Sequence, residues 1–258
     1  MRARPAGPGL FPADAVIRRV SREGVLLAGG PRALLLQVAH PAVAAGVLAH
    51  SDFRADPLRR LQRTLDAMLT IVFGTDAEAR AAAAGVARVH ARVVGPGYAA
   101  TDPDLALWVH ATLVDTARCV YRLVVGRLDA REEAAWYEDT KVVAEVLGIP
   151  VRVPDDVAAF DAYWDGMLKG GGLRVGPAAR EIASAVLRPG LRGVPGFVYR
   201  LGDVITAGLL PRSLREAYGL PFGPGRRVAF AVWRDMTRAV VRVTPPALRA
   251  VQWSRPAA

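Results

Sequence analysis

Residues 56–94 of this chain read DPLRRLQRTLDAMLTIVFGTDAEARAAAAGVARVHARVV, and this stretch predicts two consecutive helices. Asp56-Pro57 places an N-cap before a proline at the first helical position, so we expect the first helix to start at Pro57 and to end before Gly74. Residues 75–78 (TDAE) form a capping box, and the second helix that it starts should run to about Val94. The Gly-Pro-Gly at 95–97 then breaks it.

The same start and stop signals recur on both sides of this pair. Further helices are expected at about 103–125, 129–147, 154–168, 211–218 and 226–243. Upstream, residues 33–51 carry no formal charge and are interrupted by His40-Pro41, which favours a buried helix pair over a membrane span. Valine-rich stretches are too short to build a sheet. We therefore predict an all-α fold, a single multi-helix globular domain over residues 13–245, with a flexible tail at 1–12 and a C-terminal tail at 246–258.

Composition excludes several classes of protein. The 258 residues are 52% hydrophobic, enough for a sizeable core, and the lone Cys119 excludes an intramolecular disulfide. The net charge is +10, but the arginines are spread along the chain and are not paired with stacking aromatics, so we expect no nucleic-acid partner. The N-terminus has no secretory h-region, and a cytoplasmic protein without a transmembrane segment is expected.

Several common catalytic motifs are absent from the sequence. It contains no Gly-x-Ser-x-Gly, no GxGxxG, no Walker loop and no Glu-x-x-His. Serine hydrolase chemistry, nucleotide-driven chemistry and a ferritin-like di-iron site are therefore not expected.

Two of the four histidines, His90 and His110, lie inside predicted helices among apolar neighbours. A buried imidazole needs a partner for each ring nitrogen, and a metal ion can be one of them. Taken alone, a histidine in such a position is more often a hydrogen-bonded core residue than a metal ligand. The spacing does not decide between the two, since no pair lies at i and i+4.

A third group of candidate residues is Arg60, Arg63 and Thr64, which share one face of the helix starting at Pro57. They could form a solvated basic face. Alternatively, two guanidinium groups and a hydroxyl could point into a pocket that holds an anion or a polarised oxygen.

A resemblance to a known family adds to this reading. The blocks that carry it, in order along residues 14–240, are RALLLQVAHPAVA at 32–44, HSDFRADP at 50–57, RLQRT at 60–64, VFG at 72–74, HARV at 90–93, YAATDP at 98–103, LWVHATL at 107–113, and 210–221. With these blocks the chain resembles the MpaB-type oxygenases, a family that includes the latex clearing proteins.

The resemblance implies a globin-like helical core around haem b. It places the proximal iron ligand on His90, with Arg60, Arg63 and Thr64 on the distal side, and His110 becomes a further cofactor-binding candidate. Arg63 stands where the rubber cleavers carry a lysine, and arginine is a poor iron ligand because it stays protonated. No glutamate occurs between residues 39 and 63, although the rubber cleavers use a glutamate base there.

The function that follows is a haem-dependent oxygenase that uses dioxygen on a small hydrophobic substrate, with isoprenoids as candidates. The departures at Arg63 and at the missing glutamate put rubber cleavage itself in doubt. The alternative is a non-catalytic helical carrier or sensor of haem or of a hydrophobic ligand. A haem absorption band in the purified protein would favour the oxygenase.

Overall fold

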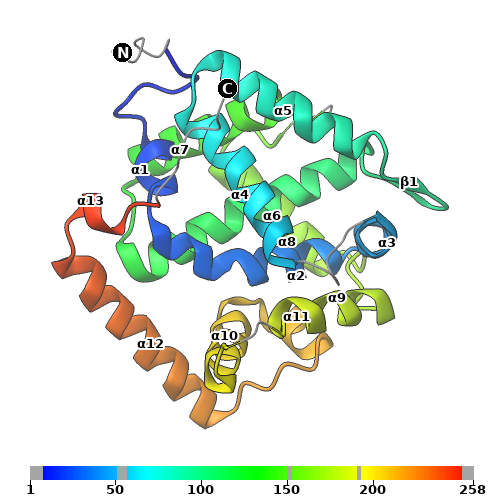
Figure 1. Ribbon diagram of the computed structural model, residues 1–258, viewed down its shortest axis with the longest axis vertical. Coiled ribbons are helices and arrows are strands. Elements are labelled where there is room, and N and C mark those ends of the chain that lie inside the picture. Colours follow the sequence, from blue (N-terminus) through cyan, green and yellow to red (C-terminus); the bar gives the residue numbers. More distant parts are fainter. Residues whose placement is uncertain (1–7, 51–56, 150–152, 191–192, 252–258) are drawn as a thin grey trace.

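Helices make up most of the chain in the computed structural model, which describes residues 8–50, 57–149, 153–190 and 193–251 (Figure 1). The N-terminal part contains α1 (Val16–Ser21), the 3-10 helix η1 (Gly24–Gly29), α2 (Gly30–Val38) and α3 (Pro41–His50). The predicted helix pair is confirmed, and its two halves bend by 110° at the break before Pro41. No single helix in the described ranges has the length and apolarity needed to cross a membrane.

The stretch that predicts two helices forms α4 (Pro57–Phe73) and α5 (Asp76–His90). The capping box is confirmed, because the Glu78 amide donates to the Thr75 hydroxyl at 3.2 Å and the Thr75 amide donates to the Glu78 carboxylate at 2.7 Å. Gly74 allows the tight connection, since a Cβ there would lie 2.5 Å from the carbonyl oxygen of Thr70. Only glycine fits between the two helices.

The predicted end of α5 is wrong by four residues. The helix stops at His90, and residues 94–99 form a small antiparallel hairpin of β1 (Val94–Gly95) and β2 (Tyr98–Ala99). Gly97 has φ 76°, the left-handed conformation that a tight hairpin turn requires and that glycine adopts without strain. The β-branched and aromatic residues that flank the turn favour extended backbone, so they pair as strands instead of extending the helix.

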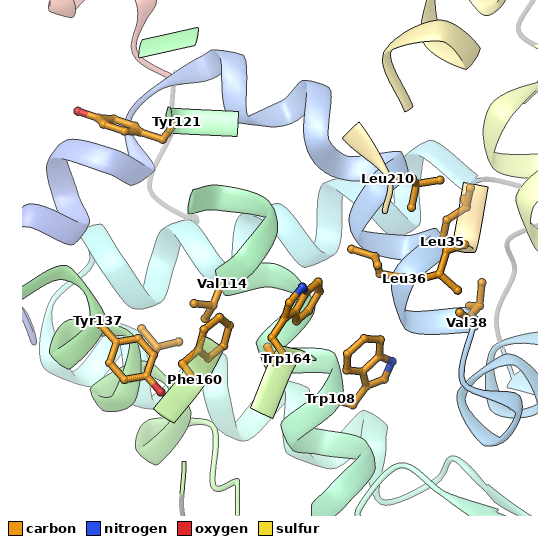
Figure 2. Close-up of a cluster of buried hydrophobic side chains, with 14 of the residues drawn as sticks. Leu35, Leu36, Val38, Trp108, Val114, Tyr121, Tyr137, Phe160, Trp164 and Leu210 are labelled. Atoms are coloured by element: carbon orange, nitrogen blue, oxygen red, sulfur yellow. The ribbon is translucent and has the colours of Figure 1, made fainter. Parts of the chain in front are cut away.

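The core gathers buried side chains from most of the helices, among them α2, α4, α6 (Pro103–Val120), α7 (Ala130–Val146) and α8 (Val157–Lys169). A row of aromatic rings runs through it (Figure 2), in which the centroids of Trp108 and Trp164 lie 5.4 Å apart, those of Trp164 and Phe160 6.3 Å, and those of Phe160 and Tyr137 5.5 Å. Rings at these separations bury large apolar areas in attractive geometries, so this row of rings holds α6, α7 and α8 together.

After α6 the chain makes one π-helical turn, η2 (Tyr121–Val125).

The C-terminal part contains α9 (Pro177–Leu187), α10 (Gly196–Leu209), α11 (Arg212–Ala217), α12 (Pro224–Val243) and α13 (Pro246–Arg249). Of these, α9 packs on α2 and α3, whereas α12 packs on η2 and α10 along the edge of the molecule (Figure 1). The last two helices predicted from the sequence are therefore found close to their expected bounds.

Both ends of the described chain are packed against the helices. The carbonyl oxygen of Pro8 accepts a hydrogen bond from the Asp76 amide at 3.0 Å, and Phe11 is buried. At the other end, the Val251 amide donates to the carbonyl oxygen of Arg22 at 2.8 Å. Packed structure thus extends beyond residues 13–245 on both sides.

Candidate functional site

The hairpin of α4 and α5 is packed at its turn and exposed at its open end. Near the turn, Ile71 and Val72 of α4 and Ala79 and Ala83 of α5 are buried. Further from the turn, residues 62–64 at the start of α4 and residues 87–92 at the end of α5 are exposed. The two helices separate with distance from the turn (Figure 1). The sequence-predicted residues Arg63, Thr64 and His90 all belong to this open end.

His90 lies in the last turn of α5, and its side chain is exposed. The sequence placed it near the middle of a helix, and the early end of α5 accounts for the difference. Its neighbour Val89 is 61% exposed. Partial desolvation by surrounding atoms lowers the pKa of His90, so its imidazole is neutral at neutral pH. A neutral imidazole beside exposed apolar surface has the chemistry of an axial haem ligand.

The Arg63 and Thr64 side chains are exposed, and the Arg60 side chain lies outside the described part of the structure. Arg63 and Thr64 project from α4 at the end of the hairpin that also carries His90. The prediction that these three residues face one pocket with His90 stays a prediction.

His110 is the buried histidine of the chain. It lies on α6, is 5% exposed, and neither of its ring nitrogens has a hydrogen-bond partner among the described residues. Burial lowers its pKa to about 4, so the ring is neutral at neutral pH. Leaving a buried polar group unpaired costs about 1–3 kcal/mol. Such a cost is expected where a ligand or an ordered water completes the site.

The other two histidines join α3 to the segment between α5 and α6. The Nε2 atom of His50 lies 3.1 Å from the Tyr98 hydroxyl, and the two rings meet edge to face at 5.9 Å. Burial lowers the pKa of His40 and the nearby Asp102 carboxylate opposes this effect. Asp102 caps α6 two turns, about 12 Å of helix, before His110. His50 thus contacts the hairpin, and only His40 interacts with the residue that caps the helix carrying His110.

Arg32 is a central residue to which sequence reasoning assigned no role. Its side chain is 4% exposed and donates to Thr116 and Asp115 of α6, both at 2.5 Å, and to the carbonyl oxygen of Leu209 at 2.8 Å. Its guanidinium carbon also lies 6.0 Å from the centre of the Trp164 ring. Every donor nitrogen is used, so Arg32 joins α2, α6 and the end of α10. Its only signal in the sequence is a charge inside an apolar run.

A second polar pair that the sequence did not reveal lies on α10. Asp203 and Thr206 are buried one turn apart, and one carboxylate oxygen and the hydroxyl have no partner among the described residues. The other carboxylate oxygen pairs with exposed Arg188 at 3.2 Å. Within the described ranges, no three His, Cys, Asp or Glu side chains are placed to hold a metal ion together. A haem iron needs only one or two protein ligands, because the porphyrin supplies the other four.

Comparison with known proteins identifies the family. Residues 17–243 match the family model described as the catalytic domain of the ER-bound oxygenase mpaB/B' and the rubber oxygenases. Uncharacterized proteins of Mycobacterium bovis and Mycobacterium tuberculosis are each 27% identical over 227 residues, which cover 82% of this chain and 87% of the relative. No solved structure matches. The chain therefore belongs to the family of MpaB and rubber oxygenase catalytic domains.

Proposed function

We propose that this protein is a haem b-dependent oxygenase that uses dioxygen on a small hydrophobic substrate, with His90 as the proximal iron ligand. Family membership supports the oxygenase class. The observation that carries the finer proposal is the exposed His90 imidazole beside the exposed Val89 at the open end of the α4–α5 hairpin. When bound there, haem would supply the oxygen-activating chemistry.

Two features of the residues at this end of the hairpin support the proposal. His90 is neutral at neutral pH, so no proton has to be removed before a ring nitrogen binds iron. Val89 and Val94 are 61% and 55% exposed and offer apolar surface to a macrocycle. A haem that packs on these two valines would remove their apolar surface from water, which would stabilise the complex by about 25 cal/mol for each Å² buried.

Arg63 and Thr64 would serve the opposite face of the site. A guanidinium keeps its charge at all relevant pH values, so Arg63 would donate hydrogen bonds to an oxygen atom or to a propionate and would not ligate iron. The Thr64 hydroxyl can donate and accept. Fixed donors of this kind stabilise negative charge that develops on oxygen, which is the electrostatic contribution a protein makes to such chemistry.

His110 is proposed as a second residue of the cofactor site. Neither ring nitrogen has a hydrogen-bond partner among the described residues, so a bound group or water that pairs with one would remove an energetic cost. Because the pKa is held at about 4, His110 would act as a neutral hydrogen-bonding group and not as a proton source near neutral pH.

The experiment that tests this function measures oxygen consumption by haem-reconstituted protein with a panel of short isoprenoids and other small hydrophobic compounds. We expect substrate-dependent oxygen uptake and products that carry oxygen from ¹⁸O₂. Stoichiometric haem binding without oxygen uptake for any compound would favour the carrier or sensor instead. The His50→Ala variant is the matched control, because His50 is an exposed histidine outside the proposed site.

A further inference from the structure

The outer face of α12 is apolar, although the rest of this helix is rich in arginine. Val228, Val232, Met236 and Val240 recur every four residues, and Val243 follows three residues later. Each of these side chains is between 51% and 79% exposed. We call these five residues the α12 stripe. It accounts for five of the large exposed hydrophobic residues in the described part of the chain.

The α12 stripe is not covered by the fold. The opposite face of α12 packs inward through Phe230 and Trp233 against the small cluster around Val124. Gly208 of α10 sits against Phe230, since a Cβ there would lie 2.3 Å from its ring. At the start of α10, Phe197 is also exposed, at 67%. Exposed apolar area of this extent on a surface helix marks an interaction site.

A strongly basic hollow lies on a flank of α12, and none of the stripe residues lines it. It has a volume of about 240 Å³ and lies between the end of η2 and α12. Four arginines line it, together with residues 124–126, and none of the described residues that line it is acidic: Arg122, Arg127, Arg238 and Arg242. Arg238 is anchored by donating to the carbonyl oxygen of Leu123 at 2.5 Å. The hollow is therefore shaped and charged to accept an anion such as a phosphate group.

We propose that the α12 stripe and this basic hollow dock together on an anionic phospholipid surface. The stripe would enter the boundary between headgroups and acyl chains, and the arginines would bind lipid phosphates. An anionic bilayer offers both an apolar layer for the stripe and phosphate groups for the arginines on the flank of the same helix. This proposal rests on surface features of α10, η2 and α12 and does not depend on haem or on His90.

A second copy of the chain fits this face less well. Pairing two α12 helices through their stripes would bring together two helices that each carry five arginines and a single aspartate. The chain carries a net charge of +10, so such a contact would add like-charge repulsion. The only acidic residue on α12, Asp235, is already paired with Arg234 at 2.8 Å. Charge complementarity therefore favours the lipid.

The test is co-sedimentation of the full chain with phosphatidylcholine vesicles, with and without phosphatidylglycerol. We expect binding that requires phosphatidylglycerol and weakens as salt is added, because salt screens the arginines. The double variant Val232→Asp/Met236→Asp should reduce the affinity by more than about tenfold, because it puts charge in the apolar face. Arg122→Gln/Arg127→Gln should reduce it by about fivefold for each arginine removed.

Two control variants are matched to these changes. Val94→Asp alters an equally exposed valine on the hairpin, and Arg212→Gln removes an exposed arginine that is paired with Glu216 on α11. Both should bind vesicles as the unaltered chain does, and circular dichroism should show that all variants are folded.

Three results would overturn the proposal. One is no vesicle binding, or equal binding to vesicles without phosphatidylglycerol. Another is a dimer in analytical ultracentrifugation that becomes monomeric in Val232→Asp/Met236→Asp while vesicles stay unbound, which would assign the stripe to a second copy. The third is calorimetric binding of inorganic phosphate without any vesicle binding, which would assign the hollow to a soluble anion.

Discussion

The two histidines singled out in the sequence have opposite environments, and this difference decides how each can act. His90 is exposed at the end of a helix, whereas His110 is buried with both nitrogens unpaired. The exposed imidazole of His90 can exchange its water for a ligand at little cost in free energy. The buried imidazole of His110 has lost its water without gaining a hydrogen bond, which destabilises the folded protein. In the cofactor-free protein, His110 is therefore a source of instability that depends on pH.

We predict that His110 makes the cofactor-free protein lose stability in acid. Its pKa is about 4 when folded and about 6.5 when unfolded, so the unfolded chain binds a proton first as the pH falls. The free energy of unfolding therefore starts to fall as the pH drops below about 6.5, and the loss reaches about 3 kcal/mol near pH 4 and below. Urea unfolding of His110→Leu across this range should show a flatter pH dependence than the unaltered chain.

The exposed His50 provides the control for this measurement. His50→Leu makes the same substitution at an exposed histidine, so it shows what the loss of a histidine side chain alone does to stability. If His110→Leu and the unaltered chain lost stability equally between pH 7 and pH 4.5, the buried, unpaired state of His110 would be refuted.

At the residue scale, the sequence identified which side chains are chemically suggestive but not their surroundings. Spacing showed that His90 and His110 lie in helices, yet burial depends on contacts between helices that are distant in the chain. Arg32 illustrates the limit, because its partners Thr116 and Leu209 lie 84 and 177 residues away. A local sequence pattern cannot predict a hydrogen-bond network between such distant residues.

At the scale of single elements, local chemistry was sufficient wherever a cap or a breaker was present. The capping boxes at Thr75 and Asp129 and the N-cap at Asp102 start helices where the sequence predicts them. The error at the end of α5 has a local cause too. In the segment Val94-Gly95-Pro96-Gly97-Tyr98, the Gly-Pro-Gly predicts the end of a helix, but together with the flanking Val94 and Tyr98 it also favours a β-hairpin.

Two glycines of α10 provide a matched test of how this element packs. A Cβ at Gly208 would lie 2.3 Å from the Phe230 ring, whereas a Cβ at Gly202 would meet nothing within 4 Å. We predict that Gly208→Ala lowers the free energy of unfolding by about 1–3 kcal/mol, because the ring must move. Gly202→Ala should raise it by about 0.5–1 kcal/mol through helix propensity. Equal effects in denaturant titrations would show that α10 and α12 do not meet at Phe230.

Arg32 provides a test of how α2, α6 and α10 are held together. Arg32→Ala should lower the free energy of unfolding by about 3–5 kcal/mol, because it leaves the Asp115 carboxylate and buried acceptors without their partner. Arg212→Ala removes an exposed arginine–glutamate pair and should change stability very little. Thermal or urea unfolding compares the two, and similar small losses would mean that Arg32 does not form the buried network.

For the molecule as a whole, the all-helical class followed from caps and periodicity, and within the described ranges the two-stranded hairpin is the only sheet. The arrangement of the helices did not follow, because it depends on the aromatic row between α6, α7 and α8 and on the Arg32 network. The α12 stripe was also hidden in the sequence. Its spacing is that of a helix packed in a core, and only the structure shows that this face points outward.

The family assignment does not make this protein a rubber cleaver, and we predict that it does not cleave polyisoprene. From the resemblance we infer that Arg63 takes the place of the distal lysine of the rubber cleavers, and residues 39–63 contain no glutamate to act as a base. Haem-loaded protein incubated with latex and oxygen should give no oligo-isoprenoid aldehydes by mass spectrometry. Aldehydes above the level of a His90→Ala control would prove this prediction wrong.

The most direct test of the central claim is a haem titration of the unaltered chain, His90→Ala and His50→Ala, followed by the Soret absorbance. We predict one haem bound for each chain in the unaltered protein and in His50→Ala. His90→Ala should lose stoichiometric binding while its far-ultraviolet circular dichroism stays unchanged, because the His90 side chain is exposed in the last turn of α5. Full haem retention by His90→Ala, with a Soret band like that of the unaltered chain, would contradict the account and move the iron ligand to His110.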